Sequence, residues 1–248
     1  MGSAEDVWLF AGAIFLLAGL VKGVIGMGLP TIAMGLLSLA VPPQQAAALL
    51  IVPSLVTNVW QLLAGPRFGA LIVRLRGMMA GVIVGTLASA GILVSGAAGM
   101  ATVALGIALF AYAVVGLVGA TFTVRRRHEP WLSPIVGAAT GLVTGATGVF
   151  VLPAVPYLQA IGLEKDELIQ ALGLSFTVST LALAGGLLRG DAFQTASVWM
   201  SLLSLVPALG GMFLGQAVRR RISAATFRAI FFAGLLLLGM YLALREIA

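Results

Sequence analysis

Six long blocks of apolar residues run through this sequence and limit what it can fold into. They cover roughly residues 44–64, 69–94, 98–120, 165–188, 192–217 and 224–246. Each block has about 20 residues or more, enough for a helix to cross a hydrocarbon core of about 30 Å. Apolar residues are continuous within the blocks and do not alternate with polar ones, which favours helices over the strands of a barrel. The sequence therefore predicts an all-α integral membrane protein.

The composition agrees with a membrane location. Hydrophobic residues make up 60% of the 248 positions, charged residues only 9%, and the mean hydropathy is +1.12. Soluble domains carry about 25% charged residues. A chain with so little charge cannot cover a surface that faces water, so we expect the lipid bilayer to surround it.

Two other apolar regions are shorter and interrupted. The first begins at Trp8 and meets glycines at 23, 26 and 28 and a proline at 30, which leaves only residues 31–41 before the polar corner at 42–45. At about 1.5 Å per residue, that returning piece spans roughly 16 Å, about half a membrane. The second, residues 131–153, is also followed by a short piece that ends at the charged corner 164–167. Both regions predict a broken or re-entrant helical hairpin.

The chain contains an internal repeat. GLVxGxxG at 19–26 returns at 141–148, 122 positions later, and GVIVG at 81–85 resembles GMFLG at 211–215, 130 positions later. We interpret residues 1–248 as one membrane transport domain made of two pseudo-repeats. These repeats are residues 5–120 and 131–248, joined by a cytoplasmic linker at 121–130.

Positive charges predict the orientation. With five segments in each half, eleven of the fourteen basic residues fall on one side, mainly in the loops near 67–76, 125–127 and 219–221. The positive-inside rule places that side in the cytoplasm and both termini outside. An odd number of segments per half inverts the second half relative to the first, which is typical of transporters with midplane sites built from discontinuous helices. We therefore expect the two glycine-rich hairpin tips to meet.

With these features the chain resembles the TauE/SafE family, the sulfite exporters of bacterial cytoplasmic membranes. The resemblance covers nearly the whole chain and is carried by GLVKGVIGMGLP (19–30), PPQQAAALLIVPSLVTN (42–58), GLVTGATGVFVLP (141–153) and ALGLSFTVST (171–180). It implies a multi-pass inner-membrane protein that exports sulfite or another small organosulfur or organic anion. Family members often have a glycine run followed by proline in both halves. This second copy reads GATGVFVLP, so the two tips are not equivalent.

Lys22 lies inside one of the most apolar stretches. A lysine at the centre of a bilayer costs at least about 2.5–3.5 kcal/mol. One interpretation is a lysine whose amine snorkels to the interface. The other, which we favour, is a counter-charge for an anion beside the first tip, because the helix that starts at Pro30 presents a positive N-terminal end there.

The remaining candidate residues are glycines and polar side chains near the tips and at mid-depth. Tip glycines either let unwound backbone approach a ligand or allow close helix packing, and both interpretations stay open. For Gly81, Gly85, Gly211 and Gly215 we favour packing. Each Ser or Thr hydroxyl either lines the site or bonds back to its own helix. The predicted substrate-binding residues are Lys22, Gly23, Gly26, Gly28, Pro30, Thr57, Asn58, Thr144, Gly145, Thr147, Gly148 and Thr177.

We predict a secondary transporter that exports a small anion such as sulfite, an organosulfonate or a carboxylate, bound near the midplane between the two tips. A passive anion channel and a non-transporting assembly subunit are the alternatives. The chain has no cysteine, its one histidine, His128, lies in a loop, and no carboxylate falls in a predicted membrane interior. We therefore expect no enzyme activity, no cofactor, no metal site and no nucleic-acid partner. The sequence leaves a homo-oligomer open.

Overall fold

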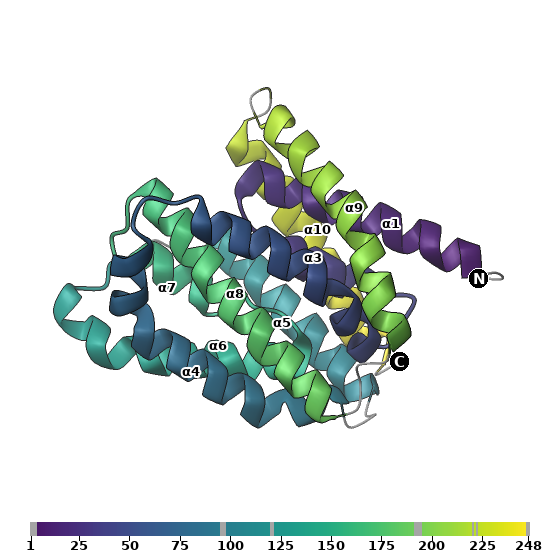
Figure 1. Cartoon of the computed structure of the whole chain (residues 1–248), viewed down its shortest axis with the longest axis horizontal. Helices are drawn as coiled ribbons and strands as arrows, with labels where there is room; N and C mark the ends of the chain where they lie inside the picture. The colour runs from purple at the N-terminus through teal and green to yellow at the C-terminus, as the bar shows by residue number, and fades with distance from the viewer. Residues whose placement is uncertain are drawn as a thin grey trace.

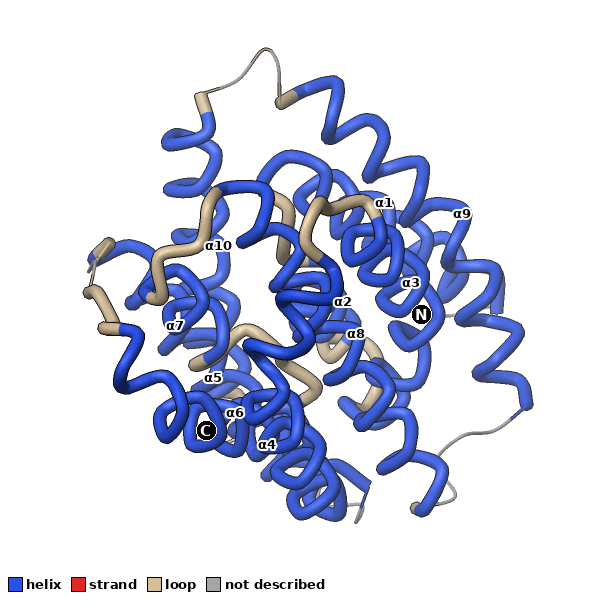
Figure 2. Tube along the Cα trace, turned by 60° about the vertical axis from the view of Figure 1, so that its left-hand side comes forward, coloured by secondary structure: helices blue, strands red, loops and turns tan. Residues whose placement is uncertain are grey.

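The computed structural model describes residues 4–94, 98–119, 122–190, 195–219, 221 and 223–246, and within these residues it contains helices and loops but no strand (Figure 2). The helices are α1 Ala4–Ile25, α2 Leu29–Leu37, α3 Pro43–Leu63, α4 Phe68–Val94, α5 Ala98–Val118, the 3₁₀ helix Arg126–His128, α6 Glu129–Thr147, α7 Ala154–Ala160, α8 Lys165–Arg189, α9 Thr195–Val218 and α10 Ala224–Leu244.

Six of these helices are long and apolar enough to cross a membrane, judged by length and composition. They are α3, α4, α5, α8, α9 and α10. Each coincides within a few residues with one of the six apolar blocks, so the prediction of an all-helical membrane protein is confirmed.

The first hairpin consists of α1 and α2. We expected the helix to break from Gly23 onward, and that expectation is wrong, because α1 continues to Ile25. Gly23 stays helical because it lies directly against the backbone of α9, where no side chain would fit. The turn is made instead at Gly26 and Gly28, whose φ angles of 80° and 104° suit glycine. Pro30 then lies in the first turn of α2.

The second hairpin consists of α6 and α7. Helix α6 ends at Thr147 and is capped by Gly148, whose φ is 70°. The segment 149–153, buried at 149–151 and half-buried at 152–153, leads into α7. The returning helices α2 and α7 measure roughly 14 and 10 Å at about 1.5 Å per residue, half a hydrocarbon core or less. Gly148 lies against the Met34 side chain, midway along α2, whereas the side chains nearest Gly28 are Val21 and Phe231. The second tip therefore contacts the returning helix of the first hairpin, which differs from the tip-to-tip contact that we expected.

Glycines join the two hairpins to the helices of the opposite half. Helix α1 packs along α9, and α6 packs along α4. The glycines of these contacts meet backbone atoms of the facing helix, which leaves no room for a side chain; they are Gly19, Gly23, Gly211 and Gly215 in the first pair and Gly81, Gly85, Gly137, Gly141 and Gly145 in the second. The packing role predicted for Gly81, Gly85, Gly211 and Gly215 is confirmed.

Helices α3 and α8 lie side by side through the middle of the molecule, with α4 and α6 on one side and α1 and α9 on the other (Figure 1). Helix α5 packs against α10. The short helix α2 contacts α1, α3, α5 and α10 and is almost entirely buried in the interior (Figure 2).

A serine of α9 replaces a hydrogen bond that α3 lacks at Pro53. Pro53 has no N–H, so the Leu49 carbonyl loses its partner in the helix. The Ser201 hydroxyl donates a 2.7 Å hydrogen bond to that carbonyl and accepts one of 3.0 Å from the backbone N–H of Val52. This exchange fixes the middle of α3 to α9.

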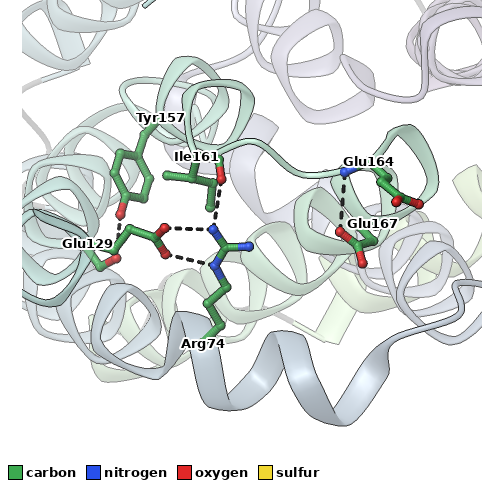
Figure 3. A network of polar contacts seen from close by, with 7 residues as sticks. Arg74, Glu129, Tyr157, Ile161, Glu164 and Glu167 are labelled. Atoms are coloured by element: carbon green, nitrogen blue, oxygen red, sulfur yellow. Dashed lines mark hydrogen bonds and ion pairs between the residues drawn. The ribbon is translucent and has the colours of Figure 1, made fainter. Parts of the chain in front are cut away.

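The second hairpin is anchored by a network around Arg74 of α4 (Figure 3). Its guanidinium donates two hydrogen bonds of 2.8 and 2.7 Å to the Glu129 carboxylate and a third, of 2.8 Å, to the carbonyl of Ile161. Glu129 begins α6 and Ile161 follows α7, so one side chain joins both arms of the hairpin to α4. The Ser133 and Tyr157 hydroxyls, 2.6 Å apart, add a second link between the arms.

The arginine-rich loops gather at one end of the molecule. The loop before α4 is held to the start of α8 by a 2.8 Å ion pair between Arg67 and Glu167 and by a 2.8 Å bond from the Arg67 N–H to the Gln170 side chain. Residue 124 of the linker bonds to the carbonyl of residue 160 at the end of α7. The ends of α3, α5 and α7 and the starts of α4, α6 and α8 therefore share one end of the bundle.

Candidate functional site

The buried lysine of α1 is bonded to the buried asparagine of α3. Lys22 is only 4% exposed, and its amine donates a hydrogen bond to the side-chain oxygen of Asn58. The Asn58 amide nitrogen is also buried and has no hydrogen-bond partner among the described residues. An unpaired buried donor costs about 1–3 kcal/mol. The pair therefore presents unused hydrogen-bond donors inside the bundle.

A cavity of about 490 Å³ reaches Lys22 from the arginine-rich end. It runs between α1, α3, α8 and α9 to the loop at 64–66 and to Arg219, just beyond the end of α9. The lining residues are Lys22, Gly23, Gly26, Thr57, Trp60, Gln61, Ala64, Gly65, Pro66, Asp166, Ile169, Met212, Gln216 and Arg219. The volume falls within the range of about 300–1,000 Å³ that is usual for small-molecule sites.

The charges of this cavity favour an anion. Lys22 and Arg219 are its basic lining residues and Asp166 is its acidic one. Thr57, Gln61 and Gln216 add neutral polar groups. Of the charged lining residues, Lys22 is the one that is buried. Because the effective dielectric constant is lower at a buried site than in water, its attraction for an anion is stronger there.

Five of the predicted site residues come together here. Lys22, Gly23, Gly26 and Thr57 line the cavity, and Asn58 bonds to Lys22. The Thr57 hydroxyl donates to the Pro53 carbonyl at 2.7 Å, so it now serves its own helix. Gly28 and Pro30 are buried at the start of α2 and do not line this cavity.

The other predicted residues lie elsewhere in the described part of the chain. The hydroxyls of Thr144, Thr147 and Thr177 each donate to a carbonyl of the same helix, at 2.8, 2.6 and 2.7 Å. Gly145 packs against α4, and Gly148 forms the turn beside Met34. None of these five lines the Lys22 cavity. The structure thus brings together five of the seven predicted first-half residues and none of the five predicted second-half residues.

Residues of α8 and α9 complete the cavity and were missed from the sequence. Gln216 and Arg219 come from the end of α9, and Asp166 from the start of α8. One signal was available for Gln216. It follows Gly215, whose motif repeats that of Gly85, and repeated glycines mark close helix contacts. If the glycines of α9 are expected to pack against those of α1, Gln216 is expected beside Gly23, as the structure shows.

The first tip separates this cavity from a second one of about 440 Å³. Lys22, Gly23 and Gly26 face the first cavity, whereas Val24, Ile25 and Met27 line the second. Arg219 and Ile169 border both. The Tyr112 hydroxyl donates to the Met27 sulfur at 3.2 Å, which ties the tip to α5.

A comparison with protein families finds one match. The model of the family described as sulfite exporter TauE/SafE matches residues 11–242, nearly the whole chain. No curated protein and no solved structure matches the chain. Members of the family are membrane transporters of sulfite and related anions, and multiple apolar helices agree with that assignment. The chain belongs to the sulfite exporter TauE/SafE family.

Proposed function

We propose that this protein is a secondary transporter that binds a small anion in the Lys22 cavity and exports it from the cytoplasm. Its two halves form an inverted repeat, its arginine-rich end faces the cytoplasm, and both termini lie outside. The conformation described here is then open to the cytoplasm.

The helix contacts support the inverted repeat. The first helix of each half packs against the fourth helix of the other half, as α1 on α9 and α6 on α4. The third helices, α3 and α8, pack on each other, and so do the fifth helices, α5 and α10. Such reciprocal pairing is expected when two similar halves are related by a two-fold axis in the membrane plane.

One observation carries the functional proposal, namely that the buried Lys22 lines a cavity that reaches it from the arginine-rich end of the molecule. Among the described residues the Lys22 amine has one hydrogen-bond partner, Asn58, although an ammonium group can donate three hydrogen bonds. An anion in the cavity accepts one of the remaining donors of the ammonium group, while Asn58 holds that group from behind. The anion replaces the water that the lysine would otherwise need to offset burial of its charge.

The cavity also limits the substrate. Its volume of about 490 Å³ exceeds what a four-atom anion needs, so a hydrated sulfite or an anion with a short organic body fits equally well. Recognition by one ammonium and several neutral groups suits a compact oxyanion of low charge. Sulfonates, carboxylates and sulfite are therefore the compounds to compare.

The test is sulfite uptake by purified protein in liposomes, with small sulfonates and carboxylates as competitors. Loss of one charge-assisted hydrogen bond costs about 1.5–3 kcal/mol, so Lys22→Met is expected to lower uptake at limiting sulfite roughly tenfold or more. Arg76→Met, which removes an exposed positive charge on α4, is the matched control. Saturable uptake that is unchanged in Lys22→Met contradicts a counter-charge role for the lysine.

The same liposomes distinguish the two alternatives. A passive channel gives flux that neither saturates nor is stimulated by sulfite on the opposite side. An assembly subunit gives no flux of any anion, in the wild type or in Lys22→Met.

Because the chain has no cysteine, a single Arg126→Cys variant reports the orientation through a reagent that cannot cross the membrane. Labelling of that cysteine from outside the cell contradicts the proposed topology.

A further inference from the structure

The second half contains a closed counterpart of the Lys22 cavity. Helix contacts give the register between the halves. Gly19 of α1 lies against the backbone nitrogen of Met212, and Gly141, 122 positions later, lies against that of Thr86. Met212 and Thr86 are 126 positions apart, as are both ends of α5 and α10. The sequence match at 130 positions therefore differs from the packing by one helical turn.

This register carries the cavity lining into the other half. Residues of α1 and α3 correspond to residues of α6 and α8 that lie 122 positions later, and residues of α9 correspond to residues of α4 that lie 126 positions earlier. Lys22 corresponds to Thr144, and Thr57 corresponds to Ser179. Met212 corresponds to Thr86. A threonine thus replaces the lysine, and Leu93 stands at the position that corresponds to Arg219.

The region of the second half that corresponds to the Lys22 cavity is closed by side-chain packing. Thr86, Thr144 and Ser179 are buried, and none of them lines either of the two cavities described above. In the open cavity, Ala64 of α3 and Gln216 of α9 both line free space. Their counterparts are Gly186 of α8 and Ala90 of α4, which pack so closely that a Cβ added to Gly186 would collide with the Ala90 side chain. Helices α4 and α8 are thus in contact at the position where the corresponding helices, α9 and α3, leave a cavity between them.

Two hydroxyls in this closed region have no partner. Thr86 Oγ1 and Ser179 Oγ are inaccessible, and neither makes a hydrogen bond to another described group. Each unpaired buried hydroxyl costs about 1–3 kcal/mol, and buried polar groups are normally satisfied. Thr144, the counterpart of Lys22, donates to the Thr140 and Val149 carbonyls of its own hairpin. Thr86 and Ser179 therefore have hydrogen-bonding capacity that this conformation leaves unused.

We propose that Thr86, Thr144 and Ser179 form a second anion site, which opens toward the outer face when the Lys22 cavity closes. This inference rests on the proposed function. The site takes the same small oxyanion and holds it with neutral hydroxyl donors alone. Hydrogen bonds from neutral donors are roughly half as strong as charge-assisted ones, so the anion leaves this site more readily than it leaves Lys22.

Single cysteines in the cysteine-free chain test the proposal. Ser179→Cys reports the closed site, Thr57→Cys the open cavity, and Ala101→Cys, buried on α5 at 1% exposure, is the control. Each is treated with a membrane-impermeant thiol reagent from either face while the protein transports sulfite. An outward-open state populated at a few per cent labels Ser179→Cys from the outer face roughly tenfold or more faster than a control that reacts only through local unfolding.

The outcomes separate the two proposals. Labelling of Ser179→Cys at the rate of Ala101→Cys, in protein that still transports, overturns the second site and leaves the Lys22 cavity intact. Labelling of Thr57→Cys from the outer face means that the Lys22 cavity itself opens outward, which also overturns the second site. No transport of sulfite by the wild type overturns the proposed function itself. If Ser179→Cys fails to fold, Thr86→Cys takes its place, and the same comparison with Ala101→Cys applies.

Discussion

The amine of Lys22 and the side-chain oxygen of Asn58 join α1 to α3 through a hydrogen bond in the interior of the bundle. Both residues are buried, and the cavity from the arginine-rich end reaches Lys22. The asparagine holds the amine without neutralising it. An aspartate at the same place would form an ion pair and remove the attraction for a second anion, which makes position 58 a sensitive test of the site.

Asn58→Asp is expected to abolish most anion transport while leaving the protein folded. The new carboxylate is nearly the same size as the amide and pairs with the lysine, so the free energy of unfolding should not fall. Uptake at limiting sulfite should fall roughly tenfold or more, the equivalent of about 1.4 kcal/mol or more. Gln216→Glu adds the same charge elsewhere in the cavity lining and should have a smaller effect, because Asn58 and not Gln216 bonds to the Lys22 amine. Equal uptake by Asn58→Asp and the wild type would mean that the Lys22 amine does not meet the substrate.

Gly23→Val is expected to separate α1 from α9. A side chain at Gly23 collides with the backbone of Met212 and Gly215, and overpacking of this kind costs about 1–3 kcal/mol. Gly12→Val on the same helix is the control, because a Cβ at Gly12 meets no atom within 4 Å. Reversible unfolding in mixed micelles measures both. The packing explanation fails if Gly12→Val destabilises the protein as much as Gly23→Val does.

Arg74→Ala is expected to loosen the second hairpin. It leaves the Glu129 carboxylate and the Ile161 carbonyl without their partner, and loss of one member of a largely buried pair costs about 3 kcal/mol or somewhat less where water enters. Arg67→Ala removes an arginine that is 63% exposed and should cost at most about 1 kcal/mol. Thermal unfolding in detergent compares the two. Similar midpoints for both variants would show that the Arg74 network contributes no more than a surface pair.

Ser201→Ala is expected to weaken the contact between α3 and α9. The Leu49 carbonyl, already deprived of a partner by Pro53, loses its only replacement. Hydrogen bonds between membrane helices contribute about 0.6–1.7 kcal/mol. Ser204→Ala on the same helix removes a hydroxyl that bonds only to the Met200 carbonyl and should be nearly neutral. Equal stability of the two variants would mean that the Ser201 hydrogen bonds do not stabilise the contact between α3 and α9.

The long helices could be predicted from the sequence because a bilayer requires about 20 continuous apolar residues for each span. The hairpin turns could be placed only to within a few residues. Gly23 was expected to break α1, but whether a glycine breaks a helix or packs it depends on what faces it, and here α9 faces it. Gly26, with open space around it and a φ of 80°, is where the chain turns.

The candidate site was half predictable for a similar reason. Lys22 and Asn58 were recognisable because charged and amide side chains are costly in an apolar stretch. Their partners on α8 and α9 were not, because Gln216 and Asp166 lie near helix ends, where polar residues are common. The second-half residues Thr144, Thr147 and Thr177 were expected to join Lys22, but each hydroxyl bonds to a carbonyl of its own helix and none lines the Lys22 cavity.

The lysine has no charged counterpart at Thr144, so in the proposed two-site cycle the anion leaves its counter-charge behind when it moves outward. Lys22 keeps its place on α1, and the charge that moves toward the outer face belongs to the anion alone. Moving one elementary charge across 100 mV is worth about 2.3 kcal/mol. A negative cell interior would therefore favour the outward step of the anion.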